Sequence, residues 1–499
     1  MNFQTLIESR EGGAPLPLSS QPETQSLSWS ALGGPDRAEM TLPAGPLGLP
    51  GWLSLLGSPL EVFNHLGQPV WWGYLEGFTA GEGSLRLETS LSRMANRVAV
   101  RYTALTPGQG WGETLQTAWA DDLPSQTLYG VKEALLDLGM LSEAAALRAR
   151  DLTLKQRAFP RLEAHGSLRS DEGQGGRLPP GAAKLSLHAR GWFETLAWKI
   201  WPGESGLLGH AAAQNGNQPL GEESAHAALA QSFVTPSDQA ALTLSLRARR
   251  EGTPGDSLKA QIRTDAAGLP GEEVLAEALL PGGELAEEAY PWVQSGFSAS
   301  AQLNAGRTYW LVLQRTGSLN SSAFYRLGVD EALGFSPQRL RLYNSASGAW
   351  SRRSPEAHLL FKLGSVQESG AQIEAVAQAG GQFLHGVAVE APTGLSVSPY
   401  QSGGQTCLAV LNALLGLGTA GLRPLLAQLT HERVLRVFPQ GEEAARWQMQ
   451  GGRLLGWDGH LATEGMLPAG EWVRGEDGSA FFPRRAHLDA HSGHWRLEG

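Results

Sequence analysis

The densest group of potential metal ligands in this sequence lies near its C-terminus, at His487, Asp489, His491 and His494. In a strand, the first three would share one face, and imidazole with carboxylate oxygen suits zinc or iron. The group straddles a predicted hairpin turn at Ser492-Gly493, however, and no second cluster lies near it in the sequence. The pattern therefore favours an ordinary exposed hairpin, and we expect neither a metal site nor a cofactor.

Residues that could act as acids or bases are sparse. His431 is expected to begin a strand, and Asp458 and His460 belong to a turn. The sequence contains no Gly-x-Ser-x-Gly elbow, no His-Glu-x-x-His pair and no Gly-Lys-Thr/Ser phosphate loop. The single cysteine, Cys407, lies in an apolar run and is interpreted as a small buried hydrophobe. We expect no catalytic residues, although a carboxylate pair for glycoside hydrolysis stays open because its members need not be close in sequence.

Aromatic residues suggest a different chemistry, because flat rings stack on sugars as well as packing in cores. The chain contains 16 tryptophans, which is a high number. Four aromatic residues are candidates for stacking on a glycan: Trp292, Tyr325, Tyr343 and Trp350. Core packing is the alternative for each of them. Three aspartates could bind a structural calcium, or could simply stabilise turns: Asp256, Asp265 and Asp330.

The length, composition and net charge of the chain limit the classes of protein to which it can belong. A length of 499 residues exceeds what one hydrophobic core supports, so several domains are expected. Abundant Gly (63) and Pro (29) with only 18% charged residues favour strands and turns. The net charge of −10 is spread along the chain, so we expect no nucleic-acid partner. We find no signal-peptide pattern and no apolar run of the ~20 residues that a membrane helix needs, so we expect a soluble protein made in the cytoplasm.

The stretch from residue 185 to residue 201 predicts how the chain is organised. Leu185, Leu187 and Ala189 alternate with polar residues as in a half-buried strand, and Gly191 ends the alternation. A short tryptophan-rich helix is expected next. The following residues lack an apolar pattern, then an all-β segment begins, and the earlier pattern resumes only near Gln372. We therefore predict one scaffold that is interrupted by an inserted module.

The predicted fold class is mainly β with minor α: small β-barrel domains in a discontinuous scaffold, interrupted by a β-sandwich or jelly roll. Numerous short strands favour barrels because closure removes exposed sheet edges. An arginine-rich helix is expected from Glu143 to Phe159. The predicted segments are an N-terminal barrel at 1–110, an α+β segment at 111–203, a linker at 204–228, the sandwich at 229–364, and a segment completing the scaffold at 370–499.

The inserted segment resembles the jelly-roll modules called carbohydrate-binding-like or choice-of-anchor domains. Its strands follow one another at about 10-residue intervals, which is typical of a sandwich. The resemblance rests on four short stretches: Gln231-Ser232-Phe233, Leu269-Pro270-Gly271, the strand at 306–313, and Gly348-Ala349-Trp350. These stretches are more specific for the fold than for any ligand.

The flanking segments, 55–203 and 370–499, resemble the baseplate hub or tail-tip proteins of long-tailed bacteriophages. The resemblance rests on the order of several motifs. In the first segment these are Leu60-Glu61-Val62, Trp71-Trp72-Gly73-Tyr74, the start of a strand at 94–100, Thr117-Ala118-Trp119-Ala120-Asp121, residues 125–133 and Arg190-Gly191-Trp192-Phe193. In the second segment they are Gln382-Phe383-Leu384, Gly418-Thr419 and the stretch at 430–437. The sandwich insertion is a departure from the simplest hub pattern. Such an insertion is physically acceptable because a long insertion in a surface loop costs little loop entropy.

The resemblance implies a structural protein of the virion tail tip. It implies a closed ring, commonly a homotrimer, that joins the tail tube to host-facing proteins. Distal tail and tape-measure proteins are further implied partners, and the projecting sandwich would contact host surface glycan or a neighbouring tip protein. A host-receptor or carbohydrate-binding protein, in which the sandwich is the functional part, is the alternative. A polysaccharide-degrading enzyme is a third hypothesis, without a positive sign in the sequence.

Overall fold

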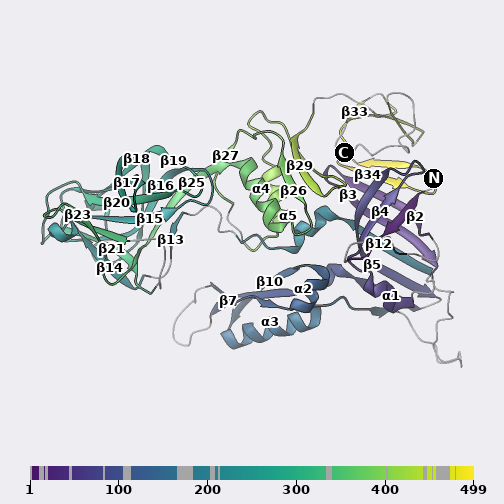
Figure 1. Cartoon of the computed structure of the whole chain (residues 1–499), viewed down its shortest axis with the longest axis horizontal. Coiled ribbons are helices and arrows are strands. Elements are labelled where there is room, and N and C mark those ends of the chain that lie inside the picture. Colours follow the sequence, from purple (N-terminus) through teal and green to yellow (C-terminus); the bar gives the residue numbers. More distant parts are fainter. Residues whose placement is uncertain are drawn as a thin grey trace. The chain divides into compact units, whose positions relative to one another are not determined.

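The computed structural model describes residues 3–10, 16, 21–43, 48–82, 85–104, 114–165, 184–202, 208–211, 214–332, 340–400, 403–441, 447–451, 453–456, 472–477 and 479–498 (Figure 1). The chain forms two compact units. The scaffold unit comprises Met1–Trp201, Ile373–Thr393 and Gly404–Gly499, and the sandwich unit comprises Pro202–Gln372 and Gly394–Gly403. The predicted mainly β fold class, with a discontinuous scaffold around an insertion, is confirmed. No described helix is long and apolar enough to cross a membrane.

The scaffold unit is built on one large, mostly antiparallel sheet. Its main path runs β1 (Gln4–Ile7), β4 (Pro59–Phe63), β5 (Pro69–Glu82), β12 (Lys184–Gly191), β3 (Leu32–Pro43), β2 (Glu23–Ser30), β34 (Arg485–Asp489) and β35 (Trp495–Glu498). Further strands join its sides: β6 (Leu85–Ser90), β11 (Glu163–His165), β26 (Gly386–Val389), β28 (Leu425–Leu429) and β29 (Val434–Pro439). Among the described strands this path is open, with β1 and β35 at its ends, so barrel closure stays a prediction.

Strand β12 lies in the middle of this sheet, between β5 and β3. Its predicted alternation is correct, because Leu185, Leu187 and Ala189 are all buried. Gly191 ends the strand where the chain passes close to β3, and a Cβ atom there would lie 1.7 Å from the Pro35 carbonyl oxygen. The helix that follows is the short 3-10 helix η2 (Trp192–Trp198), with its aromatic residues buried. No other residue type fits at position 191 without moving β3.

A smaller sheet and two helices form an α+β segment of the scaffold unit. Its strands are β10 (Glu133–Leu141), β7 (Arg97–Ala104), β8 (Thr114–Gln116) and β9 (Ala120–Asp121), and β10 runs parallel to β7. Helix α2 (Leu123–Tyr129) and helix α3 (Glu143–Arg157) belong to the same segment. Ser142 caps α3 by accepting a hydrogen bond from the Ala145 amide, and Ala146 packs on Val100 and Tyr102. The predicted helix therefore exists and ends shortly before Pro160.

An aromatic cluster joins the parts of the scaffold that precede and follow the insertion. Tyr74 packs against Trp192 and Trp198 with ring centroids 5.2 and 5.6 Å apart, and Phe383 lies 5.3 and 5.6 Å from the same two tryptophans. The Lys132 ammonium lies 4.8 Å from the Trp198 ring centroid. Burial lowers the pKa of Lys132 to about 8, and Arg157 acts in the same direction against the opposing effect of Glu76.

Backbone hydrogen bonds join the scaffold residues just before the insertion to those just after the second sandwich segment, Gly394–Gly403. The Trp201 amide donates to the Gln405 carbonyl at 2.9 Å, and the Cys407 amide donates to the Lys199 carbonyl at 2.8 Å. Helix α5 (Cys407–Leu415) begins directly after this pairing, capped by Thr406. Cys407 is buried, as its apolar context predicted, and burial raises the pKa of its thiol to about 11, with Glu133 adding to the effect.

Other elements complete the scaffold unit. Helix α1 (Gly48–Ser54) and the short helix η1 (Leu91–Arg93) lie near the N-terminal strands, and a small sheet contains β30 (Trp447–Gln450), β31 (Arg453–Gly456), β32 (Val473–Arg474) and β33 (Ala480–Phe481). Helix α4 (Ser369–Gly380) spans the boundary between the two units. The strand that His431 was expected to begin starts later, at Val434, because residues 430–433 form a turn with Arg433 at a φ of 61°.

The sandwich unit contains two sheets. The first, called here the β16 sheet, runs β13 (Leu208–His210), β25 (Phe361–Glu368), β16 (Gln239–Glu251), β21 (Phe324–Asp330) and β14 (Gly216–Leu220), with β19 (Trp292–Leu303), β24 (His358–Leu359) and β27 (Ser396–Val397) attached. The second, called the β20 sheet, runs β18 (Leu269–Pro281), β17 (Ser257–Ala266), β20 (Thr308–Arg315), β15 (Ala228–Val234), β22 (Leu340–Asn344) and β23 (Ala349–Arg352). Short 3-10 helices, η3 (Ser224–His226) and η4 (Gly282–Glu284), lie in connections.

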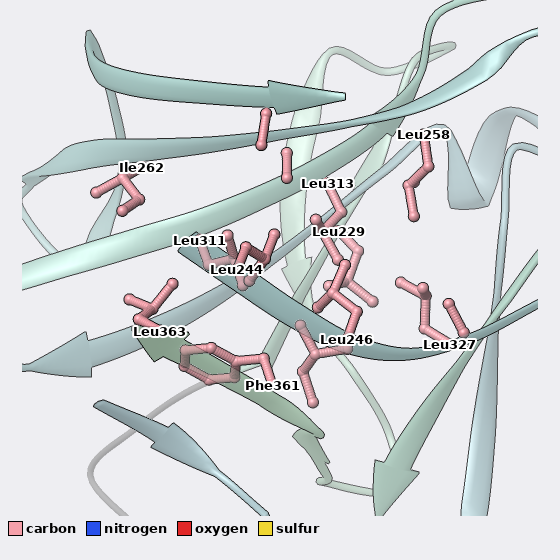
Figure 2. Packing of buried hydrophobic residues seen from close by; sticks show 14 of the residues in the cluster. Leu229, Leu244, Leu246, Leu258, Ile262, Leu311, Leu313, Leu327, Phe361 and Leu363 are labelled. Carbon is pink, nitrogen blue, oxygen red and sulfur yellow. The ribbon is translucent and has the colours of Figure 1, made fainter. Parts of the chain in front are cut away.

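The core of the sandwich lies between these sheets. Leu311 and Leu313 of β20 point toward Leu244 of β16 and toward Phe361 and Leu363 of β25 (Figure 2). All five side chains are almost completely buried. Alternate residues of each strand supply this apolar layer, as the period of two in the sequence predicted.

The predicted linker at 204–228 is wrong for the residues that form β13 and β14. Both are edge strands of the β16 sheet: β13 pairs with β25, and β14 pairs with β21. Leu208, Gln218 and Leu220 are buried. Short edge strands need only one partner, so they tolerate Gly, Asn and Pro and show little apolar pattern. The segment 394–403 was predicted to belong to the scaffold, but it contributes the two-residue strand β27 to the sandwich. A strand this short also shows little apolar pattern in the sequence.

The aromatic cluster generates a first prediction. We expect Trp198→Ala to lower the free energy of unfolding of the scaffold unit by about 3–5 kcal/mol, because Trp198 is only 5% exposed. Hydrogen exchange of the full chain in increasing denaturant, read by mass spectrometry, separates peptides of the two units.

Leu422→Ala is the control, since Leu422 is 93% exposed and its truncation leaves no cavity. Equal effects of the two variants, or a loss of protection confined to sandwich peptides, would contradict the structural role of the cluster.

Candidate functional site

The structure separates the four aromatic residues that the sequence suggested for glycan stacking. Tyr325 lies on β21 and is 0% exposed. Its hydroxyl donates toward the Asp256 carbonyl oxygen at 2.9 Å and lies 3.0 Å from Asp256 Oδ1. The prediction that Tyr325 stacks on a sugar is therefore wrong, because its ring belongs to the sandwich core.

Tyr325 instead completes a buried ion-pair cluster. Arg315 donates from Nε to Asp256 Oδ2 at 2.9 Å, and the Gly317 amide donates to the same oxygen at 2.6 Å. Burial acts to raise the pKa of Asp256, but the hydrogen bonds from Arg315, Gly317 and Tyr325 outweigh it and hold that pKa below its ordinary value. Burial, and then Asp256, raise the pKa of the Tyr325 phenol. Asp256 is therefore a structural anion.

Trp292 is half-buried at the start of β19, on the β16 sheet. Two cations lie over its ring: the Arg247 guanidinium at 5.2 Å and the Lys362 ammonium at 4.4 Å from the centroid. Both cations make cation–π contacts with the Trp292 ring, on which a sugar would have to stack. Trp292 also belongs to a different sheet from the remaining two candidates.

Tyr343 and Trp350 form a pair on the β20 sheet. They are register partners on the adjacent strands β22 and β23, with ring centroids 5.1 Å apart and an interplanar angle of 50°. Both residues are half-buried. The register of a hairpin therefore brings together two aromatic side chains that the sequence suggested separately, and leaves part of each ring exposed.

An apolar floor lies beside this pair, on the side of the β20 sheet that faces away from the core. Because Leu311 faces the core, its neighbours Trp310 and Val312 on β20 point to the opposite side. They form a small cluster there with Ala230, and Trp350 packs against it. Trp310 is 1% exposed, and its indole Nε1 donates to Asp265 Oδ1 at 2.7 Å.

Polar side chains with planar groups surround the floor. Gln261 Nε2 donates to Glu277 Oε2 at 2.6 Å, and Arg263 Nε donates to Gln261 Oε1 at 3.0 Å. Arg341 and Arg352 are register partners on β22 and β23. The apolar floor, the aromatic pair and these polar side chains together make up what we call the outer face.

The turn between β17 and β18 arches over one end of the outer face. Arg341 Nη2 lies 3.4 Å from the Gly268 carbonyl oxygen, although β20 and β15 separate β17 from β22 in the sheet. The turn has Ala267 and Gly268 at φ values of 55° and 81°, and Asp265 accepts a hydrogen bond from the Gly268 amide. The arch explains how Trp310 is buried, while Tyr343 and Trp350 lie away from it, nearer the sheet edge.

Sequence reasoning missed most of the outer face. Trp310 lies in the run Tyr309–Leu313, where every residue is apolar, so the sequence does not tell which side chains leave the core. Arg341 and Arg352 look like ordinary surface residues in isolation. A strict period of two from the core-facing Leu340 and Leu342 would have placed Arg341 and Tyr343 together.

The other candidates from the sequence have structural roles. His431 lies in a turn, where its Nε2 contacts Glu61 Oε1 at 2.9 Å and its ring packs on Trp72. Asp330 bonds His210 and Asn215, and Asp489 accepts from the amides of its own hairpin turn. Across the residues given in the fold description, no group of three or more His, Cys, Asp or Glu is placed to hold a metal ion. Asp458 and His460 lie outside the described residues.

A charged pocket of about 520 Å³ lies in the scaffold unit, where β2, β3, β34 and β35 meet the start of η2. Arg190 pairs there with Asp36 at 3.2 Å and with Glu76 at 3.3 Å. Burial, followed by the neighbouring Asp36 and Glu76, raises the pKa of Glu194, and Arg190 opposes the rise. The pocket therefore contains a carboxyl group whose pKa lies above its ordinary value.

No protein-family model and no curated protein sequence matches this chain. Among solved structures, the mosquito-larvicidal Cry4Aa toxin from Bacillus thuringiensis is similar over 62% of this chain and 51% of its own length, with 8% sequence identity and a TM-score of 0.16. The match thus spans about half of that toxin. A TM-score this low supports no statement about fold or function.

The cluster around Asp256 generates a second prediction. Its pKa is lower in the folded protein than the ~3.9 of an unfolded chain, so its stabilisation is complete above that value and is lost as the pH falls through the folded pKa. We expect the calorimetric unfolding transition of the sandwich to move to lower temperature as the pH falls below about 4. In Asp256→Asn this transition should already be lower at pH 5 and should move less on acidification.

Glu288→Gln is the matched control, because Glu288 is exposed and makes no ion pair within the described residues. An Asp256→Asn protein whose sandwich transition follows pH as steeply as that of the control would contradict the assigned role.

Proposed function

We propose that this protein is a structural component of a bacteriophage tail tip or baseplate hub, and that it acts through protein contacts. In this proposal the scaffold unit forms a ring, a homotrimer, that joins the tail tube to host-facing proteins of the tip. Distal tail and tape-measure proteins are the proposed neighbours, and the virion tail tip is the proposed location after synthesis in the host cytoplasm. The proposal rests on the hub-like order of motifs in the sequence.

The observation that carries this proposal is the discontinuous scaffold. Residues on both sides of the insertion share one sheet and one aromatic cluster, so the scaffold is complete without the sandwich strands. A scaffold of this kind can assemble symmetrically while it carries a separate module. A ring also suits a sheet with free ends, because β1 and β35 have unpaired sides among the described strands and can pair with a neighbouring subunit.

We propose glycan binding by the sandwich unit as a second function, carried out by the outer face of the β20 sheet. The paired rings of Tyr343 and Trp350, half-exposed beside an apolar floor, favour this function over a purely structural one. Sugars bind by stacking on aromatic rings and by hydrogen bonding to planar polar groups, and this face supplies both. Host surface glycan is the natural ligand for a module at a tail tip.

The assembly proposal predicts the mass of the protein in solution. We expect the full chain to have three times its 53.2 kDa monomer mass in light scattering at high protein concentration, and to appear as rings in negative-stain electron micrographs. Immunogold labelling of purified virions should place the protein at the tail tip.

Two outcomes would contradict the assembly proposal. One is a monomer at every concentration, both alone and after mixing with the tail-tube protein encoded in the same genome. The other is gold label on the capsid or along the tail, with none at the tip.

A further inference from the structure

An apolar groove of about 930 Å³ lies in the scaffold unit. It is bounded by the end of α5, by the turn that leads into β28, and by the chain between β33 and β34. Leu415, Leu425 and Leu426 form its floor and are only 2–4% exposed, while Phe481 and Phe482 form one wall. Its volume is within the range of ~300–1,000 Å³ of clefts that bind ligands. We call it the α5 groove.

Two leucines at the rim of the α5 groove are exposed. Leu417, which follows α5, is 49% exposed, and Leu422, in the turn before β28, is 93% exposed. The second value is the highest for any large hydrophobic side chain in the described part of the chain. One exposed leucine is ordinary, but two of them beside a recessed apolar floor form a continuous surface of the kind that marks interaction sites.

The turn that carries Leu422 holds this residue in an unfavourable conformation. Its φ of 59° is left-handed, which a residue with a Cβ atom rarely adopts. The Leu422 amide donates to the Thr419 carbonyl at 2.9 Å, and the Arg423 amide donates to Thr419 Oγ1 at 3.1 Å. Packing within the subunit does not offset the cost, because the leucine side chain is almost fully exposed. The turn therefore presents an apolar group in a fixed position, which favours a contact with a partner.

The rim of the α5 groove is positively charged. Its described lining residues include three arginines and no aspartate or glutamate. Arg485 is the strand partner of Glu498 and also borders the charged pocket, so we count its charge as balanced. The Arg423 guanidinium donates to the Gln440 carbonyl oxygen at 3.1 Å, and this neutral acceptor leaves its positive charge in place. Arg484 is exposed and has no ion pair within the described residues. Two positive charges therefore remain at the rim.

These properties distinguish between the possible occupants of the groove. A second copy docked through the same groove would bring two sets of arginines together, and like charges disfavour such an interface. A membrane surface could receive Leu422, but it could not reach the floor, which is recessed and nearly buried. A protein segment can place apolar side chains in the groove and carboxylates at its rim, as amphipathic helices do in the grooves of other proteins. Shape and charge together favour this last occupant.

We propose that the α5 groove binds an acidic, amphipathic segment of a neighbouring protein, with its apolar side chains against Leu422 and the leucine floor and its carboxylates on Arg423 and Arg484. This inference rests on the proposed function of the scaffold unit as a component that acts through protein contacts, and it adds the chemistry of one partner. It does not depend on the number of copies in the ring or on the outer face of the sandwich.

The test uses the full chain and two fluorescent, helix-forming peptides of equal length, with binding measured by fluorescence anisotropy. The acidic peptide has leucine on one face and glutamate on the other, and the basic peptide has lysine in place of every glutamate. We expect the unmodified chain to bind the acidic peptide at least tenfold more tightly than the basic one. This preference should decrease as salt is raised, because the contacts at the rim are exposed.

Variants of the groove separate its apolar part from its charged part. Asparagine tolerates the left-handed conformation, so Leu422→Asn should keep the turn folded while it weakens binding of the acidic peptide at least fivefold. Arg423→Glu combined with Arg484→Glu should reverse the preference, so that the basic peptide binds more tightly. Unfolding cannot produce such a reversal, since it would weaken the binding of both peptides.

Matched changes elsewhere in the scaffold unit are the controls. Leu66 is 58% exposed in the turn between β4 and β5, and Arg148 is exposed on α3. Leu66→Asn and Arg148→Glu should bind the acidic peptide as the unmodified chain does.

Three results would overturn this inference. Equal binding of the two peptides by the unmodified chain would remove the acidic class of partner. Binding of neither peptide by a chain that forms rings would remove the groove as a docking site and leave the assembly proposal in place. Binding of phosphatidylglycerol vesicles that Leu422→Asn abolishes, without peptide binding, would assign the surface to a membrane. Peptide binding as expected, by a chain that is absent from the tail tip, would instead support this inference and remove the tail-tip proposal.

Discussion

Burial of the aromatic rings of Tyr74, Trp192, Trp198 and Phe383 is the interaction on which the scaffold depends. These residues come from β5, from η2 and from the segment after α4, so their contact fixes the return of the chain after the insertion. Large rings contribute much apolar area per residue, which is important where only short segments meet. Pairing of β34 with β2 and of β28 with β3 holds the later strands of the second part of the scaffold, and the aromatic cluster fixes the segment that contains Phe383.

The two sides of the β20 sheet differ in composition. Its inner side supplies leucines to the sandwich core, and its outer side holds Trp310 and Trp350 beside a network of amide, carboxylate and guanidinium groups. Strand alternation keeps the two sets of residues apart, so a change on the outer side leaves the packing of the core intact. Core packing and the side chains of the outer surface can therefore vary independently in this unit.

Much of the fold was predictable from the sequence, and the failures have physical causes. The alternation in β12, the range predicted for α3 and the sandwich rhythm are local signals, and they gave correct elements. Edge strands such as β13 and β14 have weak local signals because one side of each is unpaired. The candidate site was only partly predictable: Tyr343 and Trp350 do meet, whereas the burial of Tyr325 follows from Asp256 and Arg315, far away in sequence. Such contacts depend on strand order, which a single sequence does not specify.

The paired amides and carbonyls at Lys199, Trp201, Gln405 and Cys407 have an evolutionary consequence. They place the first exit of the chain from the scaffold beside its last return, while the scaffold residues Ile373–Thr393 separate the two segments of the sandwich. A different guest domain would therefore have to replace both segments and keep the scaffold residues between them. This arrangement favours gradual substitution on the surface of the sandwich over replacement of the whole domain by one recombination event.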